Sequence, residues 1–138
     1  MFVFNPSPEF WWPVKVIEPD PDNPGKMIER EFEALFEMLG PDETDVIAKN
    51  RQKIVAKLMA VDLSPEEIDA LQGELEEHDR EATHRALKGW RGIEEAPGRP
   101  MPFDDVNFRY VYKHRRIRNA LVAAYLDATN DDKARLGN

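Results

Sequence analysis

The sequence predicts an α+β fold that is mainly α-helical, with an N-terminal β-hairpin or strand pair followed by about four helices. Two observations support this prediction: apolar residues alternate near the start, and apolar residues recur at helical spacing over most of the remainder. A chain of 138 residues has the usual length of one domain. We therefore predict a single domain over residues 1–138, with a β-rich segment at 10–38, helices within 41–129 and flexible ends at 1–9 and 130–138.

The first predicted strand carries the residues that we expect to meet a partner. Aromatic and β-branched residues alternate from Phe10 to Val16, and Pro13 confines such a strand to a sheet edge. Neighbouring tryptophans in a strand point to opposite faces, so both rings cannot lie in one core. An isolated hairpin also leaves unpaired edges, which predicts a homo-oligomer. The candidate residues for self-association or partner binding are Trp11, Trp12, Val14 and Val16.

The second predicted strand has an ambiguous pattern. Residues 19–25 contain three prolines and a glycine and predict a turn or loop. Beyond it, Phe32 and Phe36 fit both a period of two and a helical spacing. The alternation favours a strand for the first half of residues 26–39, whereas propensity favours a helix for the second half, so strand and helix both stay open for 32–39.

Two helices are predicted in the middle of the chain. The first begins at Pro41 and ends near Asp62. The second begins with Ser64 as N-cap and Glu67 reaching back, and runs to about Lys88 with its apolar stripe continuing to Trp90. Gly73 allows a break in that helix, because glycine costs about 1 kcal/mol in a helix interior.

The last third of the chain predicts a loop and two more helices. Glycines and prolines mark a loop after Trp90, and Asp104 or Asp105 is placed to cap a short helix that contains Phe108. A final helix carries an apolar face. The candidate core residues are Trp90, Phe103, Leu121 and Tyr125.

The residues that catalysis or metal binding would require are missing or badly spaced. There is no cysteine, which excludes disulfides, thiolate zinc sites and catalytic thiols. Glu81 and His84 match half of a dinuclear metal motif, but no second Glu-x-x-His pair occurs. His78 and His84 lack the spacing of a zinc protease helix, and no glycine-rich phosphate loop is present. We predict a protein that is not an enzyme, with no catalytic, cofactor-binding or metal-binding residues.

The net charge and the hydropathy of the sequence predict the kinds of partner and the compartment. The net charge of −8 disfavours nucleic acid as a partner, and the absence of a long apolar run or a signal-like start disfavours a membrane. We expect a cytoplasmic protein. A local positive cluster of Lys113, Arg115, Arg116 and Arg118 is interpreted as the solvated face of a helix.

Several motifs, taken in order, resemble the tail assembly chaperones of long-tailed bacteriophages. They are EFWWPVKVIEPDPDNPGKMIEREFEALFEML, ALKGWRGIEEAPGRPMPFDDVNF, IRNALVAAYLDAT and KARLGN. The shared features are an aromatic-Trp-Pro-Val strand, spaced phenylalanines, a Trp-x-Gly turn, a Pro-Phe pair before a helix and a basic Gly-Asn ending. Together they touch most of the chain.

The resemblance implies a chaperone that binds the tape measure protein and helps to recruit tail tube subunits in the host cytoplasm. Such a protein leaves before the tail is complete and is absent from the mature virion. Two alternatives stay open: a head-tail completion or minor tail protein that is retained in the virion, and a small nucleic-acid-binding regulator that uses residues 113–118.

The interpretation of the basic cluster can be tested by DNA binding. We expect negligible affinity for random duplex DNA near physiological salt, because four positive residues oppose a total charge of −8. Fluorescence anisotropy with a labelled duplex measures this affinity. A salt-sensitive complex tighter than about 10⁻⁶ M, lost on Arg115→Glu and Arg116→Glu, would instead support the regulator.

Overall fold

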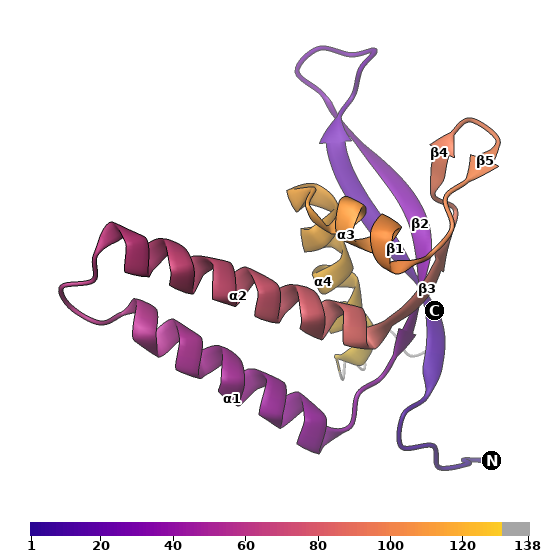
Figure 1. The fold of residues 1–138 in the computed structure, drawn as a ribbon. Coiled ribbons are helices and arrows are strands. Elements are labelled where there is room, and N and C mark those ends of the chain that lie inside the picture. Colours follow the sequence, from indigo (N-terminus) through magenta and orange to yellow (C-terminus); the bar gives the residue numbers. More distant parts are fainter. Residues whose placement is uncertain (131–138) are drawn as a thin grey trace. The chain divides into compact units, whose positions relative to one another are not determined.

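A computed structural model describes residues 1–130 of the chain (Figure 1). Their contacts divide into two compact units, one of residues 1–8 and 37–86 and the other of residues 9–36 and 87 onward. We call the first the helical unit and the second the sheet unit. The predicted single domain stays a prediction, and the predicted flexible tail lies outside the described residues from position 131 onward.

The sheet unit is built on a three-stranded sheet with the order β1-β2-β3. Its strands are β1 (Glu9–Pro19), β2 (Met27–Glu37) and β3 (Leu87–Arg91). The chain as a whole also contains the helices α1 (Pro41–Leu58), α2 (Pro65–Ala86), α3 (Asp105–Tyr112) and α4 (Arg115–Thr129). The predicted α+β class, with an N-terminal hairpin and four helices, is therefore confirmed for the described residues.

The loop between β1 and β2 is held by local hydrogen bonds. The Asp20 carboxylate accepts from the Asn23 side chain at 2.8 Å and from the Asp22 amide at 3.0 Å. These bonds, that of Asn23 first, lower the pKa of Asp20 from its ordinary 3.8. The resulting stabilisation is present above that value and is lost as the pH falls through the lowered pKa. Gly25 completes the turn with a φ of 80°.

Strand β2 resolves the ambiguity at residues 32–39. It is a strand throughout Met27–Glu37, so the helix favoured by propensity is wrong there. Phe32, Ala34 and Phe36 are buried, which is the period of two that a strand requires. As the central strand, β2 is hydrogen-bonded on both sides, and this pairing outweighs the helix preference of Glu, Ala and Leu.

Strand β3 corrects the prediction that residues 41–129 are helical and that α2 continues to Lys88. Helix α2 ends at Ala86, and residues 87–91 pair antiparallel with β2, with Ala34 opposite Trp90 and Phe36 opposite Leu87. The apolar stripe ending in Trp90 therefore belongs to a helix only up to Ala86. Two short strands, β4 (Glu94–Ala96) and β5 (Arg99–Pro100), form a separate hairpin in the predicted loop.

The helical unit is an α-helical hairpin. Helix α1 ends at Leu58, before the predicted Asp62, and Asp62 itself turns the chain with a φ of 65°. The predicted capping box of α2 is confirmed: the Ser64 hydroxyl oxygen accepts from the Glu67 amide at 3.1 Å, and Glu67 accepts from the Ser64 amide at 3.2 Å. Helix α2 runs unbroken through Gly73, so the suggested break is wrong.

Ion pairs join the two helices of this unit. Arg51 of α1 meets Asp79 of α2 at 2.9 Å. Near the other end, Arg85 donates to Glu43 of α1 at 2.7 Å and to Glu37 at 3.0 Å. These hydrogen bonds, that of Glu37 first, raise the pKa of the Arg85 guanidinium. The hairpin is thus held by polar pairs in addition to its one buried α1 side chain, Ile54.

The core of the sheet unit lies between the sheet and helices α3 and α4. Asp104 caps α3 by accepting from the Asn107 amide at 2.7 Å, as one of the two predicted caps. All four candidate core residues belong to this core: Trp90 and Leu121 are buried, and Phe103 and Tyr125 pack against it partly buried. The Trp90 and Phe103 rings meet edge to face at 4.9 Å, and Tyr125 contacts Phe36 at 5.4 Å.

Trp90 offers a direct test of this core. Its side chain is 7% exposed, and its indole N–H donates to the Met101 carbonyl at 2.8 Å. We expect Trp90→Ala to cost roughly 3–5 kcal/mol in the free energy of unfolding, because it leaves a cavity and an unpaired carbonyl. Urea denaturation measures this cost. The matched control Trp11→Ala should cost much less, since that ring is 39% exposed; equal costs would contradict the assignment.

Candidate functional site

The two neighbouring tryptophans of β1 point to opposite faces of the sheet, as predicted. Trp12 is half-buried and packs against the core, with its ring 6.4 Å from that of Phe10. Trp11 lies on the other face, where the Arg91 guanidinium covers its ring at 4.0 Å. Arg91 also pairs with Glu33 at 3.0 Å. Part of the exposed Trp11 surface is therefore already occupied by a cation from the same chain.

Two of the candidate partner residues belong to the core instead of a free surface. Val14 is 0% exposed, and Val16 is partly buried against the core. Both lie on the face of β1 that carries Trp12, because their numbers share its parity. Val14 therefore cannot contact a partner while the chain is folded. Among the four candidates, Trp11 is the residue exposed to solvent.

The edge of β1 is partly blocked against pairing with another strand. Strand β1 is an edge strand of the described sheet, as the proline predicted. Pro13 has no N–H to donate, and Arg116 of α4 donates to the Ile17 carbonyl at 2.6 Å. Helix α4 also packs along β1. These features limit strand addition at this edge.

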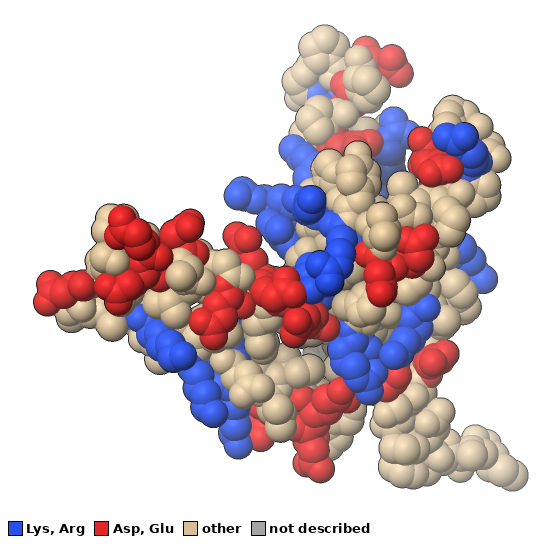
Figure 2. All heavy atoms as spheres, in the orientation of Figure 1, with Lys and Arg blue, Asp and Glu red and all other residues tan. Residues whose placement is uncertain are grey.

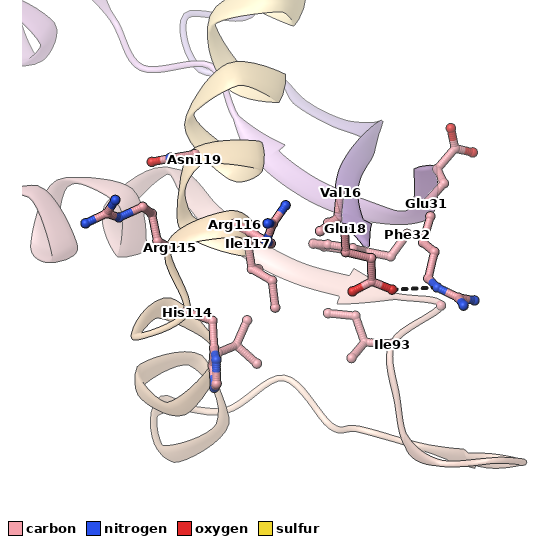
Figure 3. Close-up of a pocket in the computed structure, with 13 residues that line it drawn as sticks. Val16, Glu18, Glu31, Phe32, Ile93, His114, Arg115, Arg116, Ile117 and Asn119 are labelled. Carbon is pink, nitrogen blue, oxygen red and sulfur yellow. Dashed lines mark ion pairs between the residues drawn. The ribbon is translucent and has the colours of Figure 1, made fainter. Parts of the chain in front are cut away.

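A groove of about 810 Å³ in the sheet unit is the strongest candidate for a binding site (Figure 3). We define its floor as the five apolar residues contributed by the two strands, the turn after β3 and the two helices. They are Val16, Phe32, Ile93, Val111 and Ile117. Gly92 also lines the groove with a φ of 85°, a conformation that favours glycine. The predicted Trp-x-Gly turn thus shapes one wall.

The rim of the groove is charged, and its two sides differ. The side formed by the strands carries Glu18 and Arg30, which pair at 2.5 Å, and also Glu31 (Figure 3). The other side is the start of α4, with Arg115 and Arg116. Within residues 1–130, Arg115 makes no ion pair. The groove therefore has an apolar floor, with the Glu18–Arg30 pair and Glu31 on the strand side. On the α4 side, Arg116 is directed toward the strands and bonds the Ile17 carbonyl, and the side chain of Arg115 is directed away from the floor (Figure 3).

The basic cluster predicted as a solvated helix face is partly engaged. Lys113, Arg115 and Arg116 are exposed, but Arg116 bonds the Ile17 carbonyl. Arg118 is half-buried and lies 5.6 Å from the centre of the Tyr112 ring. Figure 2 shows Lys and Arg side chains gathered over α3 and α4, whereas acidic side chains dominate α2. The net acidity of the chain is thus unevenly distributed.

A further apolar surface lies at the N-terminus. Residues 1–4 form no helix or strand, and Phe2, Val3 and Phe4 are each at least 75% exposed. This segment belongs to the helical unit. Exposed apolar side chains in such a run are a common feature of interaction sites.

The titratable side chains within residues 1–130 provide no candidate metal centre. Across the part of the chain that is described, no group of three His, Cys, Asp or Glu side chains is placed to hold a metal ion. His78 lies 3.4 Å from Asp79, the carboxylate that Arg51 already binds. Within residues 1–130, none of the helices combines the length and hydropathy needed to cross a membrane.

Sequence reasoning identified several groove residues but not the groove. Val16 and Phe32 were expected in the two predicted strands, and Gly92 in the Trp-x-Gly turn, yet no local pattern joins them. Ile93 follows the glycine directly and gave no signal of its own. Gly92, two residues after Trp90, was the one available hint, since a glycine in a Trp-x-Gly turn marks a place where the backbone turns sharply.

Comparisons with protein families, with curated proteins and with solved structures found no match to this chain.

The predicted self-association can be tested by substituting the exposed residue of β1. We expect concentration-dependent association in sedimentation velocity at high micromolar protein, weakened by Trp11→Ser, which removes exposed apolar area without opening the core. Val14→Asp is unsuitable, because burying a charge should unfold the sheet unit at a cost above about 4 kcal/mol. A strict monomer with slow amide exchange across residues 12–17 would refute the prediction.

Proposed function

We propose that this protein is a tail assembly chaperone of a long-tailed bacteriophage, acting in the host cytoplasm by binding and not by catalysis. It binds the tape measure protein, helps to recruit tail tube subunits and leaves before the virion is complete. The observation that carries the proposal is the open groove with an apolar floor. A chaperone for a long client needs a surface that covers apolar side chains while the complex stays in solution.

The positions of the resembling motifs support the same proposal. The aromatic-Trp-Pro-Val segment is β1, the Trp-x-Gly segment ends β3, and the Pro-Phe pair precedes α3. Within the second segment, Trp90 meets Phe103 edge to face, and its N–H donates to the Met101 carbonyl. Phe36, Trp90 and Leu121, from three segments that are far apart in the sequence, belong to one core, and Val16 and Gly92 from the first two segments line the groove. The basic Gly-Asn ending lies outside the described residues.

The charge of the chain supports a role in keeping a client in solution. The net charge is −8, and the acidic side chains of α2 are largely exposed. Like charges on neighbouring chaperone molecules oppose aggregation when several copies coat one client. The exposed Phe2, Val3 and Phe4 add apolar surface for contacts with the client or with tail tube subunits.

Co-expression tests the proposal. The chain is produced with and without the tape measure protein encoded beside it in the same phage genome, and both fractions of the lysate are analysed. We expect the tape measure protein to move from the insoluble to the soluble fraction and to co-purify with the chain. The wild-type chain is compared with the variant Ile93→Asp, which places a charge on the groove floor at a partly buried position. Equal insolubility with and without the chain would contradict the proposal.

Mass spectrometry of purified particles separates the chaperone from a virion component. A chaperone is expected to be absent from mature particles. Stoichiometric copies of the chain in the particles would instead favour the head-tail completion or minor tail protein.

A further inference from the structure

We propose that the groove of the sheet unit binds an amphipathic helix whose apolar stripe is bordered by acidic side chains on the side that faces α4. This inference deepens the proposed function, because it states the chemistry of the client segment that the chaperone would hold. Binding of such a helix in the groove can also be tested independently of the proposed function.

The floor of the groove favours a ligand with apolar side chains. Phe32 and Val111 are buried beneath it, whereas Val16, Ile93 and Ile117 are only partly buried. Their remaining exposed area is removed from water only if another apolar surface covers it. The volume of about 810 Å³ is large enough for several side chains from one face of a helix, but it is open to solvent (Figure 3).

The occupant should be a helix and not an added strand. The groove is lined by residues of β1, β2, the turn after β3, α3 and α4, and on β1 the Ile17 carbonyl beside the groove already accepts from Arg116. An extended peptide lying there would bury N–H and C=O groups without partners. A helix satisfies its backbone internally and presents residues at i, i+3, i+4 and i+7 to an apolar floor.

The charge on the rim selects the border of that helix. Arg115 has no ion-pair partner among residues 1–130, and the first turn of α4 contains no acidic residue and no side-chain cap. The positive end of the helix dipole adds to the charge of Arg115 and Arg116. On the opposite rim, Glu18 is paired with Arg30, and the side chain of Glu31 is directed away from the floor (Figure 3). An acidic border is therefore favoured on the α4 side.

Two designed peptides provide the probe. Each is an amphipathic helix of about 18 residues, roughly 27 Å long, with the same leucine stripe; one carries Glu along a border and the other Lys. Fluorescence anisotropy of labelled peptides against the full-length protein gives both affinities. We expect the Glu peptide to bind about tenfold more tightly than the Lys peptide. This order opposes the net charge of −8, which alone would favour the Lys peptide.

Substitutions on the rim and the floor locate the binding. Arg115→Glu should abolish the preference for the Glu peptide. Ile93→Ala should weaken the binding of both peptides roughly tenfold, because it removes two or three methylenes from the apolar contact. The matched control is Arg109→Glu, the same charge change at an exposed residue of α3 that does not line the groove. It should leave the preference intact. Thermal melts check that each variant is folded.

Several results would overturn the inference. They are equal affinity for the two peptides, no binding of either, an unchanged preference in Arg115→Glu, or chemical-shift changes on peptide binding that avoid Ile93 and Ile117. If sedimentation shows a wild-type dimer that both Arg115→Glu and Ile93→Ala dissociate, the groove is occupied by a second copy and the proposed partner is wrong.

The outcomes distinguish the groove from the function. If the tape measure protein binds Arg115→Glu as tightly as the wild type, the groove is not its site although the chaperone role stands. If the Glu peptide binds in the groove but the tape measure protein does not bind at all, the inference about the groove stands and the proposed function fails.

Discussion

Strand β3 pairs with the central strand β2 between Leu87 and Arg91, and the architecture of the sheet unit depends on this pairing. The chain leaves the sheet after Phe36 and returns at Leu87, with the whole helical hairpin inserted between these two points. Pairing of Ala34 with Trp90 places the indole over the core, where Phe103 and the Met101 carbonyl receive it. The turn at Gly92 follows directly and forms part of the groove.

The same pairing explains how apolar residues from separate segments form one surface. Val16, Phe32 and Ile117 lie on three elements that contact each other through the sheet and α4, and Ile93 joins them because the backbone turns at Gly92. A Cβ at Gly92 would lie 3.6 Å from the Phe32 Cα and would carry a side chain in a strained backbone conformation. The groove is therefore a consequence of the core and its closing turn.

The sequence predicted the features that depend on neighbouring residues, such as helix caps and the edge position of a strand. Ser64 and Glu67 form the expected capping box, Asp104 caps α3, and Pro13 lies in an edge strand. Residues 32–37 and 87–91 could not be assigned from their own sequence, because their strand conformation depends on pairing across about fifty intervening residues. Val14 was assigned to a partner surface and is buried, because the alternation of β1 gave no sign of α4, which packs along this strand. The groove could not be predicted from any one segment, because five separate segments form it.

The proposed binding of a client helix in the groove of the sheet unit can be located on the chain. Hydrogen–deuterium exchange of the chain, alone and bound to the tape measure protein, tests it most directly, since it needs no substitution and reports on every segment. We expect slower exchange confined to residues 16–18, 30–32, 92–93 and 111–119, the segments that line the groove. Protection restricted to α1 and α2, with unchanged exchange in these segments, would contradict it.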